Sequence, residues 1–131
     1  MAKFIHMMIR VLDLEKSIAF YQTAFAFKES HRLDFSEFTL VYLRNKENDV
    51  EIELTLNKGQ TQPYEHGSAY GHCAFVVDDL DKTHQYFIDN NLSQRDIVDF
   101  APDGERIARF FFCTDPDGYE IEVLQRHGHY V

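Results

Sequence analysis

The amino-acid sequence predicts an α+β fold built from two tandem modules, each with the element order βαβββ. Three observations predict it. The chain has 131 residues, which is the length of one ordinary domain. Each half contains one stretch with the apolar periodicity of a helix and four stretches with the composition of strands. The two halves also match one another when the sequence is shifted along itself, so we expect one supersecondary unit to occur twice.

The internal repeat has two registers that differ by three residues. A shift of 66 residues places His6 on His72, and a shift of 69 residues places Glu53 on Glu122. The repeat predicts a first module, a linker rich in Gly, Pro, Ser and Gln, a second module and a short tail, over residues 1–57, 58–69, 70–126 and 127–131.

Each module is expected to begin with a strand that leads into a helix. Asp13 and Asp79 are placed to cap the N-termini of the two helices. Apolar residues spaced by three and four, beginning at Leu14 and Leu80, give each helix one apolar stripe. Turn sequences separate three further strands in each module. The expected strands are Phe4–Val11, Lys28–Leu33, Glu37–Arg44 and Val50–Leu56, then Tyr70–Val77, Ser93–Asp99, Arg106–Cys113 and Tyr119–Gln125.

Charge and composition disfavour several classes of protein. The chain has 13 Lys and Arg against 22 Asp and Glu, a net charge of −9. This charge disfavours binding to nucleic acid or to an anionic membrane surface. Cys73 and Cys113 lie far apart without a CxxC motif, so neither a disulfide framework nor a zinc knuckle is expected. We find no signal peptide and no apolar stretch of membrane-spanning length, so we expect a cytoplasmic protein.

Strand alternation brings possible metal ligands onto one face of each module. Residues two apart in a strand point to the same side, so His6 shares a face with Arg10, and Glu51 shares a face with Glu53. The corresponding residues of the second module are His72, Glu120 and Glu122. If a pseudo-twofold axis relates the modules, two imidazoles and two carboxylates converge. Such a mixed nitrogen and oxygen set suits a divalent transition metal and leaves positions open for substrate oxygens.

Five stretches carry a family resemblance: His6–Leu14, Ser17–Tyr21, Ile52–Asn57, Gly67–His72 and Asp115–Glu122. In these stretches the chain resembles glyoxalase I (lactoylglutathione lyase) of the short bacterial type, in the vicinal oxygen chelate superfamily. The resemblance implies four metal ligands, and it selects Glu53 over Glu51 and Glu122 over Glu120. The implied ligands are His6, Glu53, His72 and Glu122.

The resemblance also implies a reaction and an assembly. The reaction would convert the hemithioacetal of methylglyoxal and glutathione into S-lactoylglutathione through an enediolate, with the metal as a Lewis acid. The metal is expected to be Ni²⁺ or Co²⁺, with Zn²⁺ as an alternative, and to lie between the subunits of a homodimer. Glu122 is the first candidate for the catalytic base, and Glu53 could take the other proton-transfer step. Arg10 and Asn57 fall where the family binds glutathione.

The chain departs from the family pattern in two places. The acidic stretch Ala101–Arg106 stands where the family usually carries Lys and Gly, so Arg106 or Arg109 would have to supply the cation that contacts the substrate. The stretch Phe25–Phe27 stands where the family commonly has a Gly after the first helix. The alternatives are another metalloenzyme of the superfamily (an epimerase, an extradiol dioxygenase or a thiol transferase) and a metal-free dimer that binds a small molecule or drug.

Overall fold

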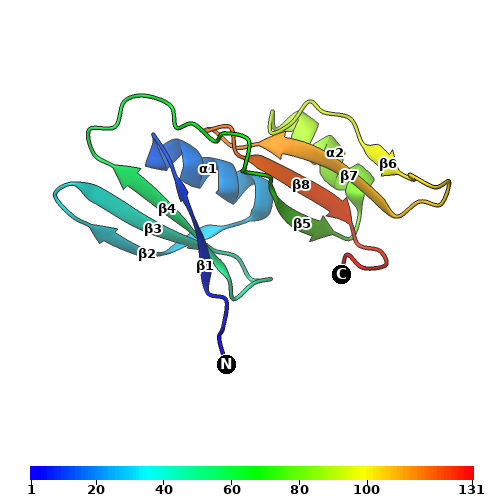
Figure 1. Ribbon diagram of the computed structural model, residues 1–131, viewed down its shortest axis with the longest axis horizontal. Coiled ribbons are helices and arrows are strands. Elements are labelled where there is room, and N and C mark those ends of the chain that lie inside the picture. Colours follow the sequence, from blue (N-terminus) through cyan, green and yellow to red (C-terminus); the bar gives the residue numbers. More distant parts are fainter. The chain divides into compact units, whose positions relative to one another are not determined.

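The computed structural model describes all residues, Met1–Val131, and divides them into two compact units, Met1–Glu65 and His66–Val131. Each unit consists of one helix and one four-stranded sheet (Figure 1). Neither helix could cross a membrane, because none is both long and apolar enough. The first unit contains β1 (His6–Arg10), α1 (Leu14–Phe25), β2 (Lys28–Asp34), β3 (Phe38–Arg44) and β4 (Glu51–Asn57). The second contains β5 (Cys73–Val77), α2 (Leu80–Asp89), β6 (Val98–Phe100), β7 (Ala108–Thr114) and β8 (Glu120–Gln125).

The two sheets have the same topology. Their strand orders are β1-β4-β3-β2 and β5-β8-β7-β6. Strand β1 runs parallel to β4, and β5 runs parallel to β8. The remaining pairs of neighbouring strands are antiparallel. The predicted α+β class and the repeated βαβββ order are therefore confirmed.

The helix starts lie where the sequence predicts them. The carboxylate of Asp13 accepts a hydrogen bond from the backbone N–H of Lys16 at 3.1 Å, and that of Asp79 accepts one from Lys82 at 3.0 Å. Each bond satisfies an N–H group that has no partner within its own helix. The same three-residue spacing in both units reflects the internal repeat.

Strand β6 is shorter than the predicted Ser93–Asp99, because it covers only Val98–Phe100. The Ser93 hydroxyl donates to the backbone carbonyl of Phe112 at 2.7 Å and accepts from the N–H of Arg95 at 3.1 Å. These side-chain bonds replace the strand ladder over this polar stretch.

One face of each sheet is apolar and is covered by the helix of its own unit. In the first unit Val41 and Leu54 are fully buried, and Leu14 and Tyr21 of α1 are also buried. In the second, the ring of Phe111 in β7 lies 5.2 Å from that of Phe87 in α2. The opposite face of each sheet is free to carry polar side chains, since strand alternation points them away from the helix.

Helix α1 ends on a residue with a left-handed backbone. Ala26 has φ 56° and ψ 29°, and its N–H bonds back to the carbonyl of Gln22 at 3.0 Å. A residue with a Cβ is strained in this conformation by about 1 kcal/mol, whereas glycine is not. We expect Ala26→Gly to raise the free energy of unfolding by about 1 kcal/mol. Ala19→Gly, inside the same helix, should lower it by about the same amount. Urea denaturation of both variants measures the difference, and destabilisation by Ala26→Gly would contradict the argument.

Candidate metal centre

The first unit brings an imidazole and a carboxylate together on the sheet face opposite the helix. Nε2 of His6 in β1 lies 2.9 Å from a carboxylate oxygen of Glu53 in β4. The Glu53 residue is 8% exposed, while the His6 side chain is 35% exposed. A carboxylate this buried needs a partner, and His6 supplies one.

The second unit repeats this pair with equivalent residues. Nε2 of His72, the residue just before β5, lies 3.1 Å from a carboxylate oxygen of Glu122 in β8. The Glu122 side chain is 15% exposed and that of His72 is 42% exposed. Each unit therefore presents one nitrogen donor and one oxygen donor side by side.

An aromatic ring packs against each imidazole from β3 or β7, the strand next to that of the glutamate, and sequence reasoning missed both rings. The rings of His6 and Tyr42 meet edge-on with centroids 5.7 Å apart, and those of His72 and Phe112 do so at 5.2 Å. Tyr42 pairs with Glu53 in the ladder, and Phe112 pairs with Glu122. Aligning each predicted glutamate strand with the strand before it, to find the ladder partners of the two glutamates, would have identified both rings. Burial, and then the adjacent Glu53 carboxylate, raise the pKa of Tyr42.

The second carboxylate on each face points to an arginine. Glu51 contacts an Arg44 nitrogen at 3.3 Å and also accepts a hydrogen bond from the Ser30 hydroxyl. Both oxygens of Glu120 are taken up by the Arg95 guanidinium, at 2.6 and 2.8 Å. Arg95 holds the pKa of the Glu120 carboxyl below its usual value. The two glutamates of each face therefore differ in their contacts: Glu53 and Glu122 lie beside an imidazole, whereas Glu51 and Glu120 contact an arginine.

The donor spacing fits a divalent metal ion. Two donors that each lie about 2.1 Å from an ion, at right angles to one another, are about 3.0 Å apart. The His6–Glu53 and His72–Glu122 distances of 2.9 and 3.1 Å match that edge, and they also suit a direct hydrogen bond. No third His, Cys, Asp or Glu joins either pair to complete a group of three. Each unit by itself therefore offers only two such donors.

Two predicted substrate-binding residues lie on the same sheet face as His6 and Glu53. Arg10 ends β1, where it pairs with Thr55, and its side chain is exposed. Asn57 ends β4, two residues further along, and donates a hydrogen bond to the Tyr64 hydroxyl at 3.2 Å. Alternation along β1 and β4 gives them this common side.

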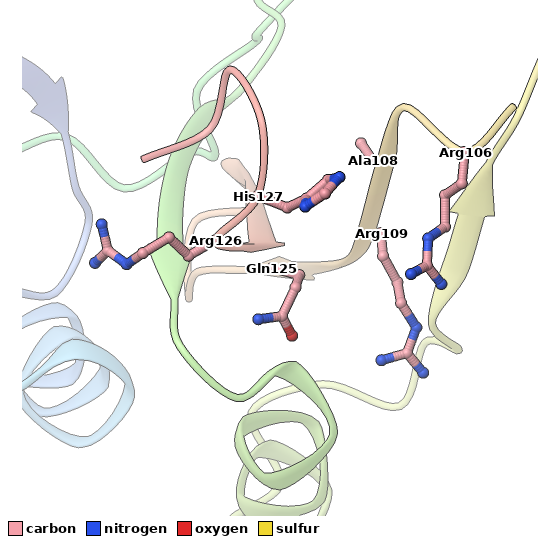
Figure 2. A pocket seen from close by; sticks show the side chains of 6 residues that line it. All are labelled: Arg106, Ala108, Arg109, Gln125, Arg126 and His127. Carbon is pink, nitrogen blue, oxygen red and sulfur yellow. The ribbon is translucent and has the colours of Figure 1, made fainter.

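Arg106 lies in a different part of its unit. It lines a pocket of about 230 Å³ at the start of β7 and the end of β8, drawn in Figure 2. The pocket is also lined by Ala108, Arg109, Gln125, Arg126 and His127. Gln125 is three residues beyond Glu122, or about 10 Å along the strand. Arg106 and Arg109 contact the Asp99 carboxylate at 3.2 and 3.4 Å, so aspartate already offsets their charge.

The two cysteines are free, and they lie on the helix-covered side of their sheet. Both are ladder partners of Ile121, whose side chain points away from the Glu122 side. Burial raises the pKa of Cys73 to about 11 and that of Cys113 to about 12. Neither thiol is therefore a reactive nucleophile at neutral pH.

Comparison with known proteins identifies the family. The sequence model of the Glyoxalase/Bleomycin resistance protein/Dioxygenase superfamily matches residues 3–123. The chain belongs to this superfamily. A lactoylglutathione lyase of Haemophilus influenzae is 35% identical to it over 127 residues, which is 94% of this chain and 92% of that protein. A probable lactoylglutathione lyase of Synechocystis sp. is 36% identical over 126 residues, covering 92% of this chain and 93% of that protein.

Solved structures agree with the family assignment. The trypanothione-dependent glyoxalase I of Leishmania major matches with a TM-score of 0.75 and 33% identity, covering 95% of this chain and 87% of that one. Glyoxalase I of Zea mays matches with a TM-score of 0.77 and 27% identity, covering 96% of this chain and 45% of that one. The resemblance to glyoxalase I within this superfamily is thereby confirmed.

Proposed function

We propose that this glyoxalase-superfamily chain is a lactoylglutathione lyase, which isomerises the hemithioacetal of methylglyoxal and glutathione to S-lactoylglutathione. The observation that carries the proposal is the pair of His–Glu contacts, one in each unit, at the spacing of neighbouring metal ligands. Relatives that carry this name match nearly the whole chain, which supports the same reaction. The free cysteines suit a reducing cytoplasm.

In this proposal one divalent ion is held by His6 and Glu53 of one subunit and by His72 and Glu122 of the other subunit of a homodimer. The ion is proposed to be Ni²⁺ or Co²⁺, as the resemblance to short bacterial glyoxalase I implies, with Zn²⁺ as the alternative; mixed nitrogen and oxygen donors suit all three. When bound, the ion would supply Lewis-acid stabilisation of the negative charge that develops on the substrate oxygens. The four side chains supply the remaining part of the chemistry.

Glu122 is the better candidate for the base that removes the substrate proton. Tyr42 interacts with Glu53, and a hydroxyl that donates to a carboxylate makes that carboxylate a weaker base. At the equivalent place Glu122 has Phe112, which has no hydroxyl. Glu122 would take the proton from the carbon that bears sulfur, giving the enediolate. A proton is then returned to the neighbouring carbon, a step in which Glu53 can take part.

Arg10, Asn57 and Arg106 are proposed to bind the glutathione part of the substrate. Arg10 is expected to act on ground-state binding, since it offers charge to a carboxylate that does not change during the reaction. We expect Arg10→Ala to raise KM for the hemithioacetal about tenfold and to leave kcat within about threefold. Lys16→Ala, an equal change of charge on the exposed side of α1, should alter neither constant. A loss confined to kcat would contradict the binding role.

The direct test is thioester formation from methylglyoxal and glutathione, followed by the absorbance of S-lactoylglutathione. The assay should be run in parallel with trypanothione, because the Leishmania relative depends on that thiol. Turnover with glutathione supports the proposal as stated. Turnover with trypanothione alone would retain the isomerase and replace its thiol, and turnover with neither would refute the proposal.

A further inference from the structure

The sheet face opposite the helix, here called the ligand face, carries His6, Glu51 and Glu53 in the first unit and His72, Glu120 and Glu122 in the second. Each face therefore has one more carboxylate than the proposed site needs. In the ladder Cys73 pairs with Ile121, so His72 precedes β5 at the level of Glu120, yet its Nε2 contacts Glu122. In the first unit His6 is the direct ladder partner of Glu51, yet its Nε2 contacts Glu53. In both units the imidazole passes over the nearer glutamate and meets the one two residues further along.

The nearer glutamates are held elsewhere. Both carboxylate oxygens of Glu120 accept hydrogen bonds from the planar guanidinium of Arg95. This bidentate geometry fixes the orientation of the Glu120 carboxylate and also neutralises its charge. Glu51 is held by Arg44 and Ser30. The result is the same in both units: one carboxylate beside each imidazole and one turned toward a cation.

The cations come from places that the repeat does not relate. Arg44 is the last residue of β3, and the last residue of β7 is Thr114, which is the ladder partner of Glu120. Arg95 instead lies before β6, outside any strand. The common arrangement is therefore built twice by different means, and simple repetition of the module does not explain it.

Arg95 is itself fixed in place at its backbone. Its N–H donates to the Ser93 hydroxyl at 3.1 Å, and its carbonyl accepts a hydrogen bond from Nε2 of His84 at 2.7 Å. The His84 ring packs edge-on against the buried Phe111 at 4.9 Å. The segment before β6, where a longer strand was predicted, therefore has its backbone anchored at Arg95. From this anchored position the Arg95 guanidinium reaches Glu120.

We infer that Arg95 is a positioning residue that keeps Glu120 out of the metal-ligating set, and that Arg44 does the same for Glu51. This inference rests on the proposed metal centre. In this inference each unit contributes only one carboxylate to the ion, because an arginine binds the other carboxylate. Loss of Arg95 would free Glu120, two residues from Glu122 on the same face, to act as an additional ligand.

The test uses the full chain stripped of metal and titrated with Co²⁺, without substrate. The visible absorption spectrum of bound Co²⁺ reports the number and type of its ligands, which a purely structural role of Arg95 would not change. We expect Arg95→Met to alter this spectrum and to tighten Co²⁺ binding about tenfold, within the range of changes caused by residues behind metal ligands. Arg95→Met combined with Glu120→Gln restores the original net charge and should restore the original spectrum.

Two controls separate the explanations. Glu120→Gln alone should keep the original spectrum, because Glu120 is not a ligand while Arg95 holds it. Arg126→Met removes the same charge from a residue paired with Asp78 and should also keep it. An unchanged spectrum in Arg95→Met, with Co²⁺ still bound, would overturn this inference alone. Failure of the unaltered chain to bind Co²⁺ would overturn the proposed metal centre and this inference together.

Discussion

Glu122→Gln is expected to lower kcat for hemithioacetal isomerisation about 10³-fold, the typical contribution of a positioned general base. The amide has nearly the shape of the carboxylate but cannot accept the substrate proton, and it is a poorer metal ligand. The side chain lies on a surface of β8 rather than in the core, so folding should persist. Steady-state kinetics, with circular dichroism to verify the fold, measure the effect.

Glu120→Gln is the matched control for this variant. The same chemical change is made two residues earlier, on the same strand and the same face. Because Arg95 occupies that carboxylate, kcat should stay within about threefold of the original value. Equal losses in the two variants would show that general charge on this face matters and that Glu122 has no special role. Full activity of a folded Glu122→Gln protein would remove Glu122 from the mechanism.

Removing divalent metal with a chelator is expected to reduce turnover to the uncatalysed level. Without the ion, His–Glu pairs can still form hydrogen bonds, but no group remains that can stabilise charge on both substrate oxygens. Adding Ni²⁺ or Co²⁺ should restore turnover, and Zn²⁺ should restore less. The measurement is thioester formation after each addition, with metal content determined on the same samples.

His72→Ala provides the control for this prediction. With one of four ligands absent, metal binding should weaken and the added ions should restore little activity at equal concentration. Turnover that persists in protein free of metal would contradict the proposal.

The repeated fold could be predicted because its signals are local. Asp13 and Asp79 cap their helices through hydrogen bonds to residues only three positions further along the chain, and turn sequences separate the strands. The error at β6 arose because Ser93 bonds to Phe112, a residue nineteen positions away that no local pattern indicates. Propensity alone favoured a longer strand there than tertiary contacts permit.

The ligand face could be predicted only in part. Alternation in β4 and β8 places two glutamates on that face in each unit but cannot rank them. The contacts that distinguish them involve Arg44 and Arg95, which approach Glu51 and Glu120 from another strand and from a loop. The aromatic rings of Tyr42 and Phe112 also become visible only when the ladder partners of the glutamates are known. Long-range register, which one sequence does not specify, is the missing information.

The boundary between Glu65 and His66 separates two cores, each with its own helix, sheet and His–Glu pair. A break in the backbone at this point would cut no strand, no helix and neither pair. The chain is therefore suited to being divided into two polypeptides or joined end to end in a new order. If the proposed metal centre is correct, each of two such fragments would hold two of the four donors and would be inactive without the other.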